Sequence, residues 1–271
     1  MQIRIGYQLT YDCPQPTPMI LMLNVHSSRS GDLVVPDNMT VSPMVPITTY
    51  HDAFGNFCSR IVAPAGRTII SGIGAIEESG ELDPYLPDAP EHRIEELPDE
   101  VLIYLLASRY CETELLNQTA WNLFGHLAPG WSRVQAICDY VHKLILFDYQ
   151  QARPTRTAWE AHNERIGVCR DYTHLAVTLC RCLNIPARYC TGYLGDVGLE
   201  PPYGMPDFAA WFEAYLGGAW RTFDPRNNIR RASRILMARG RDATDVAIAT
   251  TFGPNYLAGF KVICDAEKVE A

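Results

Sequence analysis

Hydrophobic and polar positions alternate along the first residues of the chain. The odd-numbered residues from Ile3 to Tyr11 are all isoleucine, tyrosine or leucine, and most positions between them are polar. A period of two predicts a strand with one buried face. Further apolar runs, at 20–26 and 47–66, are separated by Pro, Gly, Asp and Asn, which favour turns. Short strands divided in this way predict an N-terminal β-sandwich over residues 1–80.

Further along, the period changes to that of a helix. Apolar residues recur three or four positions apart in three segments between residues 100 and 147. Another helix is predicted over 169–183, because the Pro186 that follows cannot continue it. Strand-like apolar runs occupy much of 187–224. Helices followed by an antiparallel run predict an α+β fold for residues 99–271.

The segment that joins these two regions has its own composition. Between Glu77 and Glu100 the chain carries ten acidic residues and four prolines. Such a stretch is typical of a solvated connection, and an acidic binding tail is the less favoured alternative. We therefore expect residues 81–98 to be an acidic, Pro-rich linker.

Charge and hydropathy exclude several classes of protein. The 271-residue chain has a net charge of −8 and shows no basic face, so we expect no nucleic-acid partner. It has no apolar run of about 18 residues, so we expect no membrane span. No secretory signal is visible at the N-terminus. Nine cysteines, an odd number without a framework spacing, favour reduced thiols and a cytoplasmic location.

Three of the cysteines fall in the predicted helix 169–183. Cys180 and Cys182 are about 200° apart around the helix axis, so they are expected to be separate core thiols. Cys169 opens the helix, where free N–H groups and the helix dipole would lower the pKa of the thiol and could hold an oxyanion. Position alone leaves Cys169 either a nucleophile or a structural thiol.

A hairpin supplies the candidate partners of Cys169. The Gly-Gly pair after Leu216 predicts a two-residue turn whose register places Trp211 opposite Asp224. Residue 209 would share their face, with its side-chain root roughly 7–8 Å from that of Asp224. A histidine there could donate to Asp224 and take the proton of a thiol, as in a Cys–His–Asp site. The chain has Ala209 at this position.

The motifs together carry a family resemblance. GVCRD at 167–171, the strand DFAAWFEAYL at 207–216 and the later FDP at 223–225 resemble the core of bacterial transglutaminase-like cysteine enzymes. The segment ARGRDATDVAIATTFG at 238–253 resembles their C-terminal part, and the β-rich first third is similar to the domain that precedes this core in many members. The resemblance implies a papain-like transglutaminase core after the β-sandwich.

The resemblance also implies roles for single residues. Cys169 corresponds to the nucleophile, Asp224 to the acid that orients the histidine, and Ala209 to the histidine itself. Either the alanine was introduced to trap an inactive state, which we favour because the neighbouring residues match the pattern, or the protein is a natural inactive relative. His174 is expected to point away from the helix start, and the other six histidines are expected to be structural. Trp211 is expected to form a wall of the substrate pocket.

These residues predict acyl transfer through a thioester on Cys169. The substrate would be a peptide or protein, and water or an amine co-substrate would release the acyl group. We expect no cofactor, and no metal because no carboxylate-rich calcium loop is present. This form would be inactive because of Ala209. The alternative is a natural pseudoenzyme that acts as a peptide-binding module. The sequence leaves the oligomeric state open.

Overall fold

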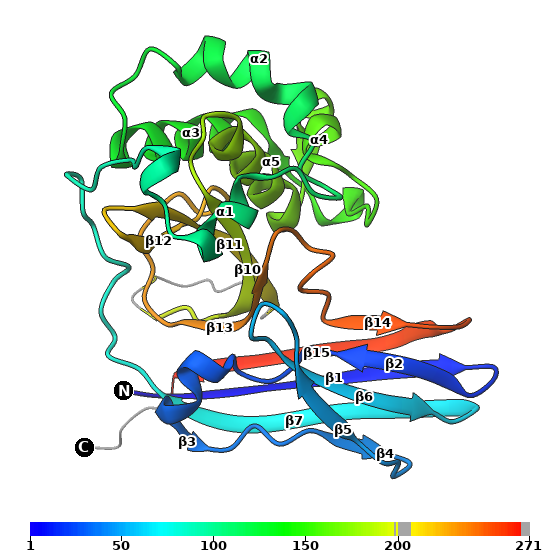
Figure 1. Ribbon diagram of the computed structural model, residues 1–271. Coiled ribbons are helices and arrows are strands. Elements are labelled where there is room, and N and C mark those ends of the chain that lie inside the picture. Colours follow the sequence, from blue (N-terminus) through cyan, green and yellow to red (C-terminus); the bar gives the residue numbers. More distant parts are fainter. Residues whose placement is uncertain (198, 200–206, 267–271) are drawn as a thin grey trace.

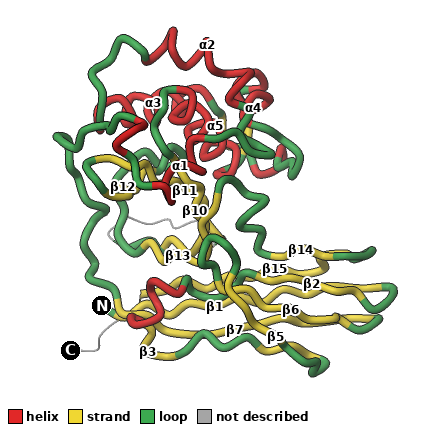
Figure 2. The backbone as a smooth tube through the Cα atoms, in the orientation of Figure 1, coloured by secondary structure: helices red, strands yellow, loops and turns green. Residues whose placement is uncertain are grey.

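The computed structural model describes residues 1–197, 199 and 207–266. A two-sheet β-sandwich forms one end of the molecule, and a four-stranded sheet covered by helices forms the other (Figure 1). Helices α2 to α5 lie on the side of this second sheet that is remote from the sandwich (Figure 2). The predicted α+β fold, with an N-terminal β-sandwich before the helical core, is confirmed.

Each sheet of the sandwich takes strands from both ends of the chain. One sheet has the order β15 (Tyr256–Ala266), β1 (Gln2–Cys13), β7 (Gly66–Glu77), β3 (Leu33–Val35), with β4 (Thr40–Ser42) also pairing with β7. The other has the order β14 (Ala249–Thr251), β2 (Thr17–Leu21), β6 (Phe57–Ala63), β5 (Thr48–His51). The alternation along β1 is confirmed, since its odd-numbered residues 3–11 are all buried.

The last strands return to the sandwich. β15 pairs antiparallel with β1, from Ile3 opposite Ala266 onwards, and β14 pairs with β2. The domain prediction assigned residues 99–271 to the core, whereas β14 and β15 hydrogen-bond within the N-terminal sheets. Periodicity identifies a strand but not its neighbour, so this return was not visible in the sequence.

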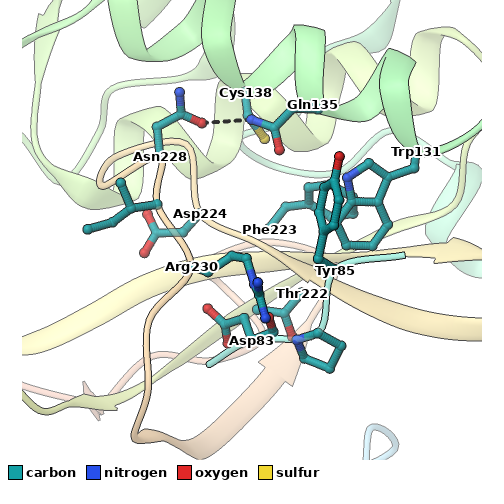
Figure 3. Close-up of a pocket in the computed structure, with 12 residues that line it drawn as sticks. Asp83, Tyr85, Trp131, Gln135, Cys138, Thr222, Phe223, Asp224, Asn228 and Arg230 are labelled. Atoms are coloured by element: carbon teal, nitrogen blue, oxygen red, sulfur yellow. Dashed lines mark hydrogen bonds between the residues drawn. The ribbon is translucent and has the colours of Figure 1, made fainter. Parts of the chain in front are cut away.

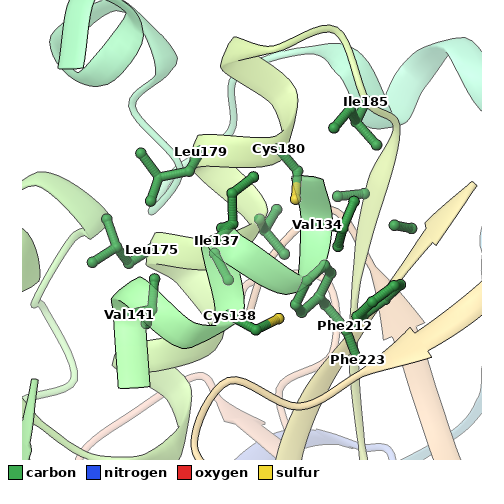
Figure 4. Packing of buried hydrophobic residues seen from close by; sticks show 14 of the residues in the cluster. Val134, Ile137, Cys138, Val141, Leu175, Leu179, Cys180, Ile185, Phe212 and Phe223 are labelled. Carbon is green, nitrogen blue, oxygen red and sulfur yellow. The ribbon is translucent and has the colours of Figure 1, made fainter. Parts of the chain in front are cut away.

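The core is built around helix α5 (Cys169–Cys182). Its sheet has the order β12 (Ala219–Phe223), β11 (Phe208–Leu216), β10 (Ala187–Leu194), β13 (Arg234–Gly240). The other helices are α1 (Asp99–Leu102), α2 (Thr113–Phe124), α3 (Trp131–Leu144) and α4 (Ala158–Glu164). Leu175 and Leu179 of α5 pack with Ile137 of α3 and Phe212 of β11 (Figure 4). This apolar contact fixes the start of α5 beside β11.

Two segments differ from their predicted elements. Residues 100–110 hold α1, the short 3-10 helix η3 (Ile103–Leu105) and an isolated bridge at Ser108, and Arg181 of α5 donates to the carbonyl oxygen of Leu106. Strand β2 ends at Leu21, and the amide of Met22 instead donates to the carbonyl oxygen of Ile248. Contacts with distant parts of the chain decide both segments.

The acidic linker is tied to the core along its length. The Asp83 carboxylate lies 2.8 Å from Nε of Arg234, and Glu91 lies 2.9 Å from Nη1 of Arg133 in α3. The amide of Gly218 donates to Nε2 of His92 at 2.7 Å. The linker therefore runs as a strap over the core, with several of its charges paired, and does not stand free in solvent.

Candidate active site

Cys169 stands at the first position of α5, directly after the short strand β9 (Ile166–Gly167). The Asp171 carboxylate turns back to accept the amide of Val168 at 2.9 Å, and it also accepts Nη1 of Arg156 at 3.0 Å. A Cβ at Gly167 would lie 2.5 Å from the same carboxylate, so only glycine fits there. In the GVCRD motif, Gly167 and Asp171 thus hold the start of α5 in one conformation.

The Cys169 thiol is half-buried, whereas the other eight cysteines, all within the described residues, are buried. It packs against Tyr189, Ala210 and Val246. Burial, with the nearby Asp207 carboxylate, raises the pKa of the Cys169 thiol to about 11. The amides of Ala210 and Arg170 act in the opposite direction but are outweighed. The expectation that the helix start lowers this pKa is therefore wrong, because the contacts that bury the thiol were not visible in the sequence.

The hairpin has the predicted register. Leu216 pairs with Ala219, and Phe212 pairs with Phe223 at the end of β12. Asp224 follows at the next position, on the row of Trp211, and Ala209 lies opposite Gly192 of β10. Ala209 directly precedes Ala210, whose amide lies beside the Cys169 thiol, and the Asp224 charge also acts to raise the pKa of that thiol.

Asp224 is buried and its carboxylate is fully engaged. Oδ1 accepts the amides of Arg226 at 3.1 Å and Asn227 at 2.9 Å. Oδ2 accepts Nδ2 of Asn227 at 2.7 Å and Nη2 of Arg234 at 2.8 Å. Each oxygen of the carboxylate, which would accept an imidazole N–H in a Cys–His–Asp site, therefore already has two donors.

Arg234 is the residue near Asp224 that the sequence did not reveal. It lies in β13, two positions from Leu236, and Leu236 stands opposite Gly192, which in turn stands opposite Ala209. Residues opposite each other, or two apart on a strand, share a face, so Arg234 and Ala209 lie on the same side of the sheet. The Arg234 side chain reaches across two strands to Asp224.

The path of Arg234 needs small residues. A Cβ at Gly192 would lie 2.0 Å from the carbonyl oxygen of Ile235, so glycine allows β13 to approach β10 closely. Ala209 adds only a methyl group on the face that the arginine crosses. The Arg234 guanidinium lies 5.4 Å above the Trp211 ring, and only 7% of its side chain is exposed. Its position near Asp224 matches the place expected for a histidine ring from residue 209.

This arrangement also buries Trp211. Only 2% of Trp211 is exposed, and it lines neither of the two cavities described below. The burial does not favour the substrate-binding role expected for Trp211. No signal in the local sequence indicated that an arginine ten residues beyond Asp224 would cover this ring.

A first cavity, of about 180 Å³, lies beside Asp224 (Figure 3). Asp83 and Tyr85 of the strap, Trp131 of α3 and Arg230 contribute to its walls. Nearby, Nε2 of Gln135 donates to the Asn228 side chain at 3.0 Å. The two carboxylates of this cavity, Asp83 and Asp224, are both paired with Arg234.

A second cavity is a cleft of about 550 Å³ between the sandwich and the core. Arg170, Tyr189 and Thr191 line it from the core, and Leu257 and Phe260 line it from β15. The cleft adjoins the site, because Arg170 follows Cys169 in the chain, Tyr189 packs against the thiol and the Thr191 hydroxyl donates to the carbonyl oxygen of Ala209 at 3.0 Å. Among the described residues that line it, Arg170 alone carries a charge.

Two further polar side chains stand near the thiol. The Tyr149 hydroxyl donates to Oδ2 of Asp207 at 3.3 Å. Burial raises the pKa of Asp207, and burial together with the Asp207 charge raises the pKa of Tyr149 to about 12. Asp207 was noted only as part of the motif, and Tyr149 was missed because its position depends on the loop before α4.

His174 does not replace the missing imidazole. It is fully buried and stacks on the Tyr110 ring, and its Nε2 accepts the amide of Ala243 at 3.1 Å. Burial lowers the pKa of His174 to about 3. The ring is therefore neutral and already engaged, in line with the structural role expected for it.

Within 1–197, 199 and 207–266, no group of three or more His, Cys, Asp and Glu side chains converges as a metal site would require. Among the helices of this same part of the chain, none is long and apolar enough to cross a membrane.

Comparison with known proteins agrees with this fold. Residues 118–225 match the sequence family described as the transglutaminase-like superfamily, so the chain contains a transglutaminase-like core. A crystal structure described as a "putative cysteine protease" from Cytophaga hutchinsonii is similar over 100% of this chain and 92% of its own, with 27% identity and a TM-score of 0.85. The family resemblance stated from the motifs is confirmed.

A shorter similarity extends to Mycobacterium leprae. An uncharacterized protein of that organism is 39% identical over 87 residues, which is 30% of this chain. The match also spans only 30% of the length of that relative.

Proposed function

We propose that this protein is a transglutaminase-like acyl-transfer scaffold in which Cys169 is the nucleophile and the general base is missing. The observation that carries the proposal is the placement of Cys169 at the start of α5. It is the one cysteine that is not buried, and it lies beside Ala210 and within the field of Asp224. The similar Cytophaga structure, described as a putative cysteine protease, supports a peptide or protein as the substrate.

The chemistry would begin with attack of the Cys169 thiolate on an amide or ester carbonyl. The amides of Ala210 and Arg170, which favour the thiolate, are also suited to hold the oxyanion. Collapse of the tetrahedral intermediate would expel the amine or alcohol and leave a thioester. Water would then give hydrolysis, and an amine would give a new amide. With alanine at position 209, no imidazole takes the thiol proton. This form therefore does not carry out the first step.

A second candidate is a natural peptide-binding module. The Asp224–Arg234 pair favours it, because a guanidinium already fills the place of the imidazole and the small residues Gly192 and Ala209 suit its path. An introduced alanine would be expected to leave a hole there instead. The encoding gene distinguishes the two origins, since a histidine codon at position 209 would identify an introduced alanine. The cytoplasmic location stays a prediction in both cases.

The test of the acyl-transfer proposal is the covalent intermediate. The Ala209→His variant is mixed with p-nitrophenyl acetate, quenched with acid and digested for mass spectrometry. An acetyl group on the peptide that contains Cys169 is expected, and glycine ethyl ester added before the quench should compete with water for it. The Cys169→Ala, Ala209→His variant is the matched control. Acetylation at other residues, or equal turnover by this control, would contradict Cys169 as the nucleophile.

A further inference from the structure

The cleft between the sandwich and the core has walls of unequal chemistry. The sandwich wall exposes apolar side chains, with Leu257 42% and Phe260 45% accessible. The core wall carries Tyr110, Tyr189 and the Arg170 guanidinium. The volume of about 550 Å³ lies within the range of roughly 300–1,000 Å³ found for small-ligand sites. Large apolar side chains left open inside a cleft indicate that a ligand covers them.

Two edge strands bound this cleft. β14 is the last strand of one sandwich sheet and β15 is the last strand of the other (Figure 1). Ala249 and Thr250 of β14 and Leu257 and Phe260 of β15 line the cleft. An edge strand presents N–H and C=O groups that an extended polypeptide can pair with. The backbone of the walls therefore suits a peptide better than a compact small molecule.

Arg170 supplies the charge that such a peptide would meet. Its Nη1 donates to the carbonyl oxygen of Pro154 at 3.0 Å and its Nη2 donates to that of Arg153, so neutral groups hold the guanidinium in place. The nearest carboxylate, Asp171, lies 3.8 Å away and is already bonded to Arg156. Among the described residues, none accepts a hydrogen bond from Nε–H or from the second hydrogen of either Nη atom, so a planar carboxylate could pair with this edge of the guanidinium.

We infer that the cleft binds an extended peptide whose acidic side chain pairs with Arg170. The inference deepens the proposed function, on which it rests, because it names the substrate class of the same site. Arg170 directly follows Cys169 in the chain, so a carboxylate held by Arg170 belongs to a residue close to the carbonyl group that Cys169 attacks. An apolar residue further along the peptide covers Leu257 and Phe260. A protein segment with an acidic residue next to the attacked position is thus the ligand of this cleft.

Peptide selection tests the charge preference without any catalysis. The protein as it stands, with Ala209, is incubated with two pooled libraries of N-acetylated hexapeptide amides that differ only in Glu or Gln at the third position. Bound peptides are recovered by size exclusion and counted by mass spectrometry. A hydrogen bond to a charged group contributes about 1.5–3 kcal/mol, so Glu peptides should be retained about 10-fold or more over their Gln partners.

Substitutions test whether this cleft is the site that binds the peptides. Arg170→Gln should abolish the Glu preference. Arg109→Gln is the matched control and should keep it, since Arg109 also lies over the Tyr110 ring but does not line the cleft. Thr250→Trp, an exposed position on the wall, should block binding of both libraries. Urea midpoints near that of the parent protein establish that each variant is folded.

Three results would overturn the inference: equal retention of Glu and Gln peptides, no retention of either, or an effect of Arg109→Gln as large as that of Arg170→Gln. None of them affects the proposed acyl-transfer function. That function is tested by acetylation of Cys169 with a small ester that makes no contact with the distal cleft.

Discussion

The two cavities near Cys169 and Asp224 differ in what remains unpaired. In the smaller cavity both carboxylates are paired within the protein, as Asp83 and Asp224 share Arg234. In the larger cleft the single charge, Arg170, is held by carbonyl oxygens, and apolar rings stay open. We infer that the carboxylates on the Asp224 side stabilise the fold, whereas the cleft on the Cys169 side holds the groups available to the proposed ligand.

The contrast between the two cavities would fail if Asp224 could still accept a hydrogen bond from a histidine at position 209. Ala209→His is expected to raise ester turnover by about 10²–10⁴-fold where the imidazole can reach Asp224. Because Arg234 occupies that place, the gain should be smaller in the parent background than in Arg234→Gln. The four proteins of this double-mutant cycle are compared by kcat/KM on p-nitrophenyl acetate. Equal gains in both backgrounds would show that Arg234 does not compete with the imidazole.

The scaffold role of the Asp224 side predicts a large loss of stability. Arg234→Met leaves two carboxylates, at Asp83 and Asp224, without their shared cation, and loss of one partner of a buried pair lowers the free energy of unfolding by about 3–5 kcal/mol. Urea denaturation measures the change. The matched control is Arg67→Met, which breaks an exposed pair with Asp12 and should have little effect. Similar losses in the two variants would end the distinction between the cavities.

The reactivity of the Cys169 thiol should depend strongly on pH. A pKa of about 11 leaves a thiolate fraction of only about 10⁻⁴ at pH 7, since the thiol is protonated below its pKa. The rate of iodoacetamide labelling at Cys169 should rise about tenfold per pH unit from 7 to 10 and level off only near 11. Peptide mapping should show Cys169 labelled before Cys180 and Cys182. A plateau below pH 9 would mean that the helix start outweighs burial after all.

Local patterns predicted the parts of the molecule that depend on neighbours in sequence. The alternation along β1, the helix that opens at Cys169 and the hairpin register of β11 and β12 all follow from spacing and turn residues. Burial of the thiol could not be predicted in this way, because Tyr189, Ala210 and Val246 come from three separate segments.

The same limit explains why Arg234 was missed. Its contact with Asp224 depends on strand order, since β13 lies beyond β10 and the side chain crosses two strands over Gly192 and Ala209. The ties of the strap, such as Asp83 to Arg234, join residues about half the chain apart. A composition rich in acid and proline says nothing about such partners, so the linker was expected to be solvated.

The pairing of β15 with β1 has a consequence for co-translational folding. β1 can pair with β7 early, but its other edge stays unpaired until residues 256–266 have been synthesised. Pairs as distant as Ile3 and Ala266 close late, because loop closure must precede the contact. The open edge of β1 is exposed meanwhile to pairing with other nascent chains. Since β15 also contributes Leu257 and Phe260 to the cleft, a chain released before residue 256 would have its thiol helix but would lack this apolar part of the cleft wall.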